Sequence, residues 1–117
     1  MNALECAELH FLIDAAGAII AFQEKEQSWA GALAFSSEAA ARHFIATSHL
    51  EVAEVAAIAA DDRASVAGLI AAMKKRPIRY LLLDLDYASG ACRQVEFDGT
   101  GFGAVTPRQF TARQPHR

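Results

Sequence analysis

Cysteine is scarce in this sequence of 117 residues. Cys6 and Cys92 are the only two, and they lie far apart, with no CxxC pair and no spacing typical of a metal site. Two isolated thiols in so short a chain fit a reducing compartment better than a scaffold built on disulfides. Long hydrophobic runs are also missing, because no apolar stretch approaches the roughly 20 residues that a membrane-spanning helix requires.

The sequence also lacks the basic segment with which a secretory signal peptide begins. Its first residues, MNALECAELHF, carry Glu5 and Glu8 instead. From these absences we expect a cytoplasmic protein that makes no contact with a membrane.

The net charge of −3 is small, but charge is distributed unevenly along the chain. Residues 1–98 carry 8 basic and 14 acidic residues, whereas residues 99–117 carry three arginines and no acid. Affinity for nucleic acid comes chiefly from neutralised phosphates, so an acidic body predicts no nucleic-acid partner. We expect the basic tail to be solvated, with contact to the body or to an acidic partner as the alternative.

Hydrophobic residues make up 53% of the sequence, but 26 of them are alanine. The core therefore depends on leucine, isoleucine and phenylalanine, while alanine favours helices and lets layers approach closely. The length is that of one domain. We predict a single α/β domain over residues 1–98, followed by a loose tail over residues 99–117 that contains glycine and arginine.

Short apolar segments predict strands at residues 9–14, 18–23 and 32–35. Gly17 lies between the first two and can take the positive φ that a tight hairpin needs. Residues 52–59 are a further strand candidate, although their alanines would also suit a helix. Residues 78–86 are strongly apolar, and residues 91–97 alternate, with Val95 and Phe97 on one face.

Two stripes of residues at i, i+3, i+4 and i+7 predict two helices. The stripes are Ala41, Phe44, Ile45 and Ser48 in the first helix, and Val66, Leu69, Ile70 and Met73 in the second. Ser36 or Ser37 is expected to cap the first, and Asp61 or Asp62 the second. Pro77 ends the second helix.

The predicted order is β-β-β-α-β-α-β-β. Its central β-α-β-α-β section favours parallel neighbouring strands, since such crossovers are right-handed. We therefore predict a mixed sheet of about five or six strands with two helices packed on it.

Four aspartates are the only candidates for a metal site: Asp61, Asp62, Asp84 and Asp86. If the strands that precede the two pairs are parallel neighbours, both pairs emerge at the carboxyl edge of the sheet, where open α/β sheets bind ligands. Asp84 and Asp86 also point the same way and can share a cation. The simpler interpretation, which we favour, is that one aspartate of the first pair caps a helix and the second pair marks a solvated strand end.

The segment LLLDLD resembles the nucleophile motif of haloacid-dehalogenase-type phosphatases. The resemblance ends at Asp86, because only 31 residues follow it and none is a lysine. Other patterns predict no catalytic residue: His43 and His49 are six residues apart on one helix, and GTGFG at residues 99–103 is followed by no helix or lysine. A spatial pair of Cys6 with His10 is the one nucleophilic arrangement left open.

An interaction surface is the remaining possibility. Trp29, the only tryptophan, lies in a polar loop near Phe22 in the sequence, and tryptophan is enriched in interface hot spots. Such a tryptophan is equally typical of a lid over a small core. The strands predicted at residues 9–14, 18–23 and 91–97 are the candidates for sheet edges, which could pair with a partner strand or a second copy of the chain.

Three segments carry a family resemblance: AFSSEAAARHF, DDRASVAGLI, and the apolar strand with its acidic end. Together they resemble small bacterial domains related to the enhanced-serine-sensitivity protein SseB, over about Leu9 to Asp86. The resemblance implies an α/β sandwich of largely unknown role and supplies no catalytic residue.

Taken together, these patterns predict a non-enzymatic cytoplasmic module without a cofactor, which works by binding a protein partner or as a homodimer. The alternative is a small-ligand or divalent-metal site at the acidic rim of the sheet, either for binding alone or for hydrolysis.

Overall fold

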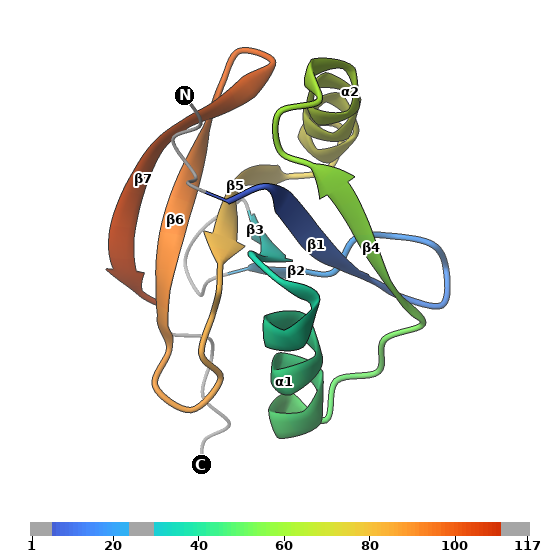
Figure 1. The fold of residues 1–117 in the computed structure, drawn as a ribbon, viewed down its shortest axis with the longest axis vertical. Helices are drawn as coiled ribbons and strands as arrows, with labels where there is room; N and C mark the ends of the chain where they lie inside the picture. The colour runs from blue at the N-terminus through green and yellow to red at the C-terminus, as the bar shows by residue number, and fades with distance from the viewer. Residues whose placement is uncertain (1–5, 24–29, 111–117) are drawn as a thin grey trace.

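The computed structural model describes residues 6–23 and 30–110. Along them the elements follow in the order β1 (Glu8–Ile13), β2 (Ala21–Gln23), β3 (Ala30–Phe35), α1 (Glu38–Ser48), β4 (Glu54–Ala59), α2 (Arg63–Lys74), β5 (Ile78–Leu83), β6 (Ala91–Asp98) and β7 (Gly101–Gln109). The seven strands form one mixed sheet and both helices pack on it (Figure 1). The predicted α/β class with two helices is confirmed.

The strand order across the sheet is β4-β1-β3-β5-β6-β7, and β2 pairs with β3 beside β1. β3 and β5 pair in parallel, while the other described pairs are antiparallel. The expectation that β4 and β5 are parallel neighbours is wrong, because β1 and β3 lie between them. Leu9 and Phe11 of β1 are buried in the core of one face and Leu12 in the core of the other, as is typical of an interior strand.

The predicted turn between β1 and β2 forms at residues 14–17. Gly17 has a φ of 86°, and Asp14 Oδ1 accepts hydrogen bonds from the amides of Ala16 and Ala18 at 2.9 and 3.0 Å. After a single bridge between Ile13 and Ile19, β2 leaves β1 and continues along β3. The positive φ is confirmed, but the hairpin ladder is short because β3 offers β2 a longer edge.

Both predicted helices are confirmed, and their N-caps are Ser37 and Asp62. Their buried residues are Ala41 and Phe44 in α1, and Val66, Ile70 and Met73 in α2. Each helix covers one face of the sheet, and each face has its own hydrophobic core. Leu81 and Leu83 of β5 belong to the core on the α2 side and Leu82 to the core on the α1 side, so β5 contributes to both.

Residues 101–109 correct the prediction of a structureless tail that begins at residue 99. They form β7, an antiparallel partner of β6, with Val105 opposite Val95 and Phe102 opposite Phe97. The rings of Phe97 and Phe102 lie 6.1 Å apart and pack against the core on the α2 side. The alternation predicted for residues 91–97 is confirmed. Val95 and Phe97 on its apolar face pack beside Val105 and Phe102 of β7.

Candidate functional site

Asp62 is the helix cap of the first aspartate pair. Its Oδ1 accepts a hydrogen bond from Ser65 N at 3.2 Å, and its Oδ2 accepts one from Ser65 Oγ at 2.8 Å. The Ser65 hydroxyl and the backbone amides of the first turn lower the pKa of Asp62 from its ordinary value of 3.8. Asp61 is exposed beside it. The capping role predicted for this pair is confirmed, and it belongs to Asp62.

Asp84 fastens three segments together instead of ending a strand in solvent. Its Oδ1 accepts a hydrogen bond from Ser36 N at 2.8 Å, and its Oδ2 accepts bonds from Ser36 Oγ at 2.8 Å and Arg93 Nη2 at 3.1 Å. Its backbone is left-handed, with a φ of 55°. Aspartate tolerates this conformation better than most residues do. We call Ser36, Asp84 and Arg93 the aspartate clasp, which joins the end of β3 and the start of α1 to β6.

Asp86 organises the turn between β5 and β6. Its Oδ2 accepts a hydrogen bond from Ser89 Oγ at 2.7 Å, and its carbonyl oxygen accepts one from Gly90 N at 2.7 Å. The Ser89 hydroxyl, assisted by the Ala88 and Ser89 amides and by the charge of His43, lowers the pKa of Asp86. Both Asp84 and Asp86 therefore hold the local chain in place.

The acidic rim predicted for the carboxyl edge of the sheet does not form. β4 and β5 are three strand spacings apart, which is about 14 Å in a sheet. Figure 1 shows β4 ending beside α2, whereas β5 ends toward the opposite side, near the turn to β6. Within residues 6–23 and 30–110, no group of three or more histidine, cysteine, aspartate or glutamate side chains could hold a metal ion.

Acid should weaken the fold through Asp62 and Asp86. Because folding lowers both pKa values, their contribution is complete above about pH 4 and is lost as the pH falls through the folded-state values. We expect the urea unfolding midpoint to fall less between about pH 6 and about pH 2 in an Asp62→Asn/Asp86→Asn variant than in the wild type. Asparagine keeps the cap at residue 62 without titrating.

Asp61→Asn is the control for this acid experiment, since it removes one negative charge without removing a helix cap. It should leave the acid dependence close to that of the wild type. An equal fall in the wild type and in the double variant would contradict the assignment.

The surroundings of Cys6, the thiol for which a pairing with His10 was left open, do not activate it as a nucleophile. Burial is the main cause that raises the pKa of the Cys6 thiol, and the negative charge of Asp84 adds to it, while Arg93 opposes it. The thiol is therefore protonated at neutral pH, whereas the thiolate is the nucleophile. His10 is buried and lies 3.4 Å from the Glu8 carboxylate.

Of the two residues predicted for an interaction surface, Phe22 lies in a row of aromatic rings. It is half-buried, and its ring centroid is 5.9 Å from that of Phe110 and 6.4 Å from that of Phe44. The row ends at Tyr87, whose ring meets Phe44 edge-on at 5.9 Å and which is 55% exposed. No sequence pattern predicts that Tyr87 belongs to this surface. It is identified only in the fold, by its contact with Phe44 of α1. Trp29 lies outside the described residues, so its role stays a prediction.

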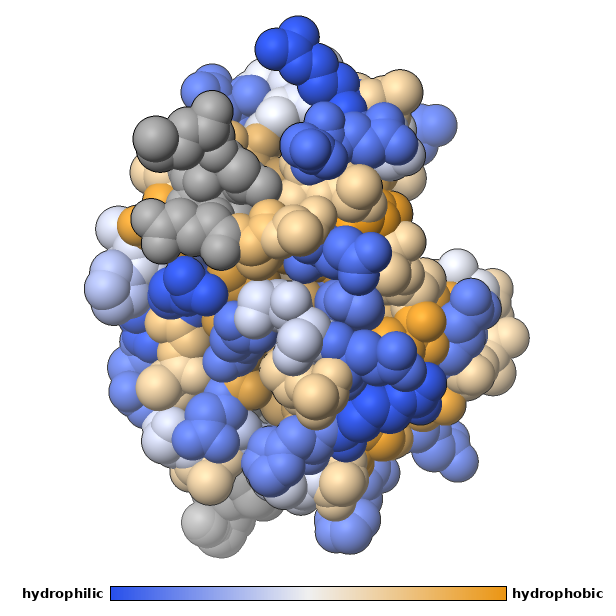
Figure 2. Space-filling view, in the orientation of Figure 1, coloured by the Kyte–Doolittle hydropathy of each residue, from blue (hydrophilic) through white to orange (hydrophobic). Residues whose placement is uncertain are grey.

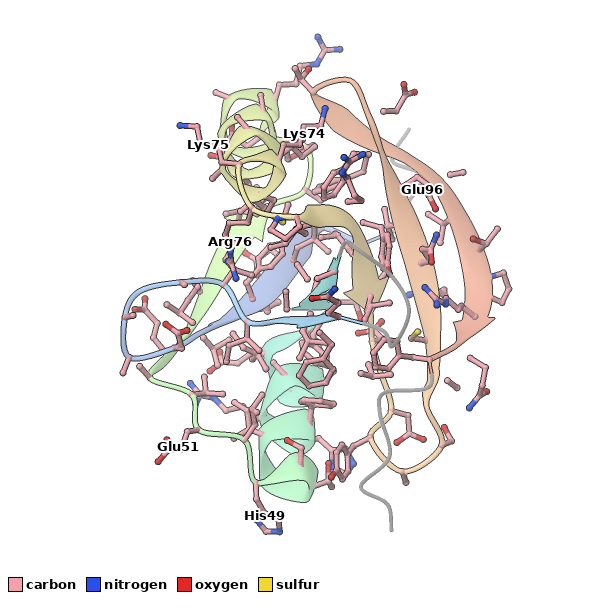
Figure 3. The ribbon with its side chains drawn as sticks, turned by 180° about the vertical axis from the view of Figure 1, so that it is seen from behind. His49, Glu51, Lys74, Lys75, Arg76 and Glu96 are labelled. Carbon is pink, nitrogen blue, oxygen red and sulfur yellow. The ribbon has the colours of Figure 1, made fainter. Side chains whose placement is uncertain are left out.

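An open pocket of about 420 Å³ lies beside the C-terminal end of α2. It is lined by Lys74, Arg79, Tyr80, Gln94, Glu96 and Phe97. Lys74 extends toward β6 and β7, where its Nζ donates to the Gly99 carbonyl at 3.3 Å, while Lys75 points to the other side (Figure 3). Because the lining mixes both signs of charge with two aromatic rings, it favours no single class of ligand.

β4 forms an open edge of the sheet. In the ranges that the structure describes it pairs with β1 alone, and its sequence, EVAAIA, has no proline, glycine, lysine or arginine. Glu54 is its only charged residue. Along the side where β4 lies in Figure 1, the space-filling view shows tan and orange, apolar residues interspersed with blue, hydrophilic ones (Figure 2).

The outward backbone groups of β4 follow from one hydrogen bond. Ala60 N donates to Ala7 O at 2.8 Å, so residue 60 faces β1. Alternate residues of an antiparallel ladder point in opposite directions in the plane of the sheet. The amides and carbonyls of Val55, Ala57 and Ala59 therefore point away from β1, ready to pair with another strand.

β7, the opposite edge, is protected in several ways. It contains Pro107, which has no amide hydrogen, and Arg108, and its pairing with β6 is interrupted between Val95 and Phe97. Proline, basic side chains and irregular register are the usual devices that stop edge strands from pairing. β4 has none of these three devices, so of the two outer strands in the order β4-β1-β3-β5-β6-β7 it is the one left available for pairing.

Comparison with known proteins adds no relative: no protein-family model, curated protein or solved structure matches this chain. The resemblance to the SseB-related domains therefore stays a prediction.

The helices within the described ranges are all too short or too polar to cross a membrane.

Proposed function

We propose that this chain is a non-enzymatic cytoplasmic module that binds a protein partner by adding a strand to β4. The single observation that carries the proposal is the outward row of backbone groups at Val55, Ala57 and Ala59 on an edge without a protecting device. Strand addition draws affinity from such main-chain groups and specificity from alternate side chains.

The chemistry of the acidic residues supports a binding role over the hydrolytic alternative. Asp62, Asp84 and Asp86 each accept hydrogen bonds that hold a helix, a clasp or a turn, which leaves them little freedom to bind a cation. The Cys6 thiol has a raised pKa. No observation favours a reaction over binding.

The partner is expected to present an extended segment with small or β-branched side chains. Ala57 and Ala59 are exposed on the α1 side of β4, and Val55 is half-buried there. Small side chains along an edge let a second backbone approach to the roughly 4.8 Å of a paired strand. The partner segment therefore needs no deep pocket, only an extended backbone.

Ala57→Pro should remove partner binding while the domain stays folded. The Ala57 amide points away from β1, so proline removes a hydrogen bond to the partner and none within the sheet, as edge positions tolerate. We expect proteins captured from a lysate of the source cells to fall by about tenfold or more in the variant. Ala57→Val is the matched control, because it keeps the amide and favours a strand.

Hydrogen exchange then locates the contact. The amides of Val55, Ala57 and Ala59 should be protected in the captured complex and should exchange freely without the partner. Equal capture by Ala57→Pro, or a complex in which these three amides stay unprotected, would contradict strand addition at β4. A Trp29→Ala variant tests the separate prediction for that residue in the same assay.

A further inference from the structure

We infer that β4 also takes the β4 strand of a second copy of this chain, in an antiparallel pair with its two-fold axis at Ala57. The inference rests on the proposed function and names one partner for the same edge. An isologous dimer requires a surface that is complementary to itself. The β4 edge meets this condition in its backbone, its side chains and its charge.

The backbone condition concerns the outward groups of β4. An axis at Ala57 places Ala57 opposite Ala57 of the other copy, and Val55 opposite Ala59 on each side of the axis. These are the residues whose amides and carbonyls point away from β1. In an antiparallel ladder such opposite residues exchange both hydrogen bonds, so every outward group of residues 55–59 gains a partner.

The side-chain condition is met because small residues face larger ones. On the α1 side, Val55 faces Ala59 across the new pair, and on the α2 side Ile58 faces Ala56. Val55 and Ile58 are half-buried at the rims of the two cores. A second β4 strand therefore continues both hydrophobic layers and covers these two side chains.

The charge condition concerns Glu54, the only charged residue of β4. The proposed axis places Glu54 opposite Ala60, and the two Glu54 residues lie six positions apart, about 20 Å at the rise of a strand. At physiological ionic strength, charges separated by more than about 8 Å are largely screened. Within residues 54–59, therefore, no like charges face each other across the pair.

The dimer should depend on concentration. A pairing limited to one strand of six residues is a small interface, below the roughly 1,200–2,000 Å² of stable complexes. Sedimentation equilibrium from about 10 µM to about 1 mM should show a monomer that becomes a dimer. Ala57→Pro should raise the dissociation constant by about tenfold or more, and Ala57→Val should not.

A charge exchange at the axis tests the register. In Ala57→Lys or Ala57→Asp alone, two like charges meet at the axis, so each variant should be monomeric. An equimolar mixture of the two should form a heterodimer, because opposite charges then face each other. Since residue 57 is exposed, either variant should fold, and rescue by mixing would not be expected from any register in which residue 57 does not face itself.

An isotope-filtered NOE between a Val55 methyl group of one copy and the Ala59 methyl group of the other provides a direct check. A wild-type chain that remains monomeric to about 1 mM, or a mixture of Ala57→Lys and Ala57→Asp that stays monomeric, would overturn the inference. If a monomeric wild type still binds a partner that Ala57→Pro loses, the proposed function stands and only the second copy is wrong. If Ala57→Pro loses neither partner nor dimer, both are wrong.

Discussion

Gly31→Ala is expected to lower the free energy of unfolding by about 3 kcal/mol, at the upper end of the usual range for overpacked cores. A Cβ atom at Gly31 would lie 2.5 Å from Tyr80 Cε1 and 2.7 Å from Leu82 Cγ. Both neighbours are buried, and Leu82 has no exposed surface, so neither side chain can swing away. Urea denaturation followed by circular dichroism measures the loss.

Gly68→Ala is the matched control, because the same atom is added in open space. Nothing lies within 4 Å of a Cβ at Gly68, which is in the middle of α2 and exposed. Alanine favours a helix over glycine by about 1 kcal/mol, so this variant should be more stable than the wild type. If both variants shifted stability in the same direction, close packing of Tyr80 over Gly31 would be contradicted.

Asp84→Ala is expected to destabilise the fold by about 2–3 kcal/mol. The variant loses the three hydrogen bonds of the aspartate clasp and leaves Ser36 N and the Arg93 guanidinium without this partner. It also places alanine at a φ of 55°, which its Cβ disfavours. The side chains of Arg93 and Asp84 are 40% and 28% exposed, so solvent screening keeps the ionic part of the loss small.

Two further variants separate these contributions. Asp84→Asn tolerates the left-handed backbone, and its one oxygen can still accept the bond from Ser36 N, while its amide nitrogen can donate to Ser36 Oγ. It should therefore lose the charge and the bond from Arg93, about 1 kcal/mol. Asp84→Gly relieves the backbone but keeps no acceptor. We expect stability to fall in the order wild type, asparagine, glycine, alanine. An alanine variant as stable as the asparagine variant would show that the clasp does not stabilise the fold.

The sequence predicted those elements whose residues interact with near neighbours in the chain: the two helices, their N-caps and the alternating strand β6. The stripe at Val66, Ile70 and Met73 and the cap at Asp62 lie within one helix, so spacing alone was sufficient. The alternation of Val95 and Phe97 likewise revealed β6. β7 was not predicted, because Gly101, Gly103 and Pro107 are unfavourable in strands and interrupt the alternation of its sequence. Its strand is stabilised instead by pairing with β6.

The candidate sites depended on contacts that no local pattern contains. Asp84 and Ser36 are 48 residues apart, so nothing near LLLDLD shows that both carboxylate oxygens are occupied. The predicted acidic rim failed for the same reason, since β1 separates β4 from β3 only in the folded sheet. The edges predicted at residues 9–14 and 91–97 are wrong, because β1 and β6 each pair with a strand on both sides. Only the strand order identifies β4 as an edge.

The single parallel pair at the centre of the described sheet has a consequence for synthesis. β3 and β5 are joined by the chain from residue 36 to residue 77, which includes α1, β4 and α2. Closing so long a loop is slow, because its entropy is lost before the contacts form. A nascent chain that has not yet released β5 from the ribosome lacks the strand that contributes to both cores, so β3 emerges without its parallel partner until residues 78–83 arrive.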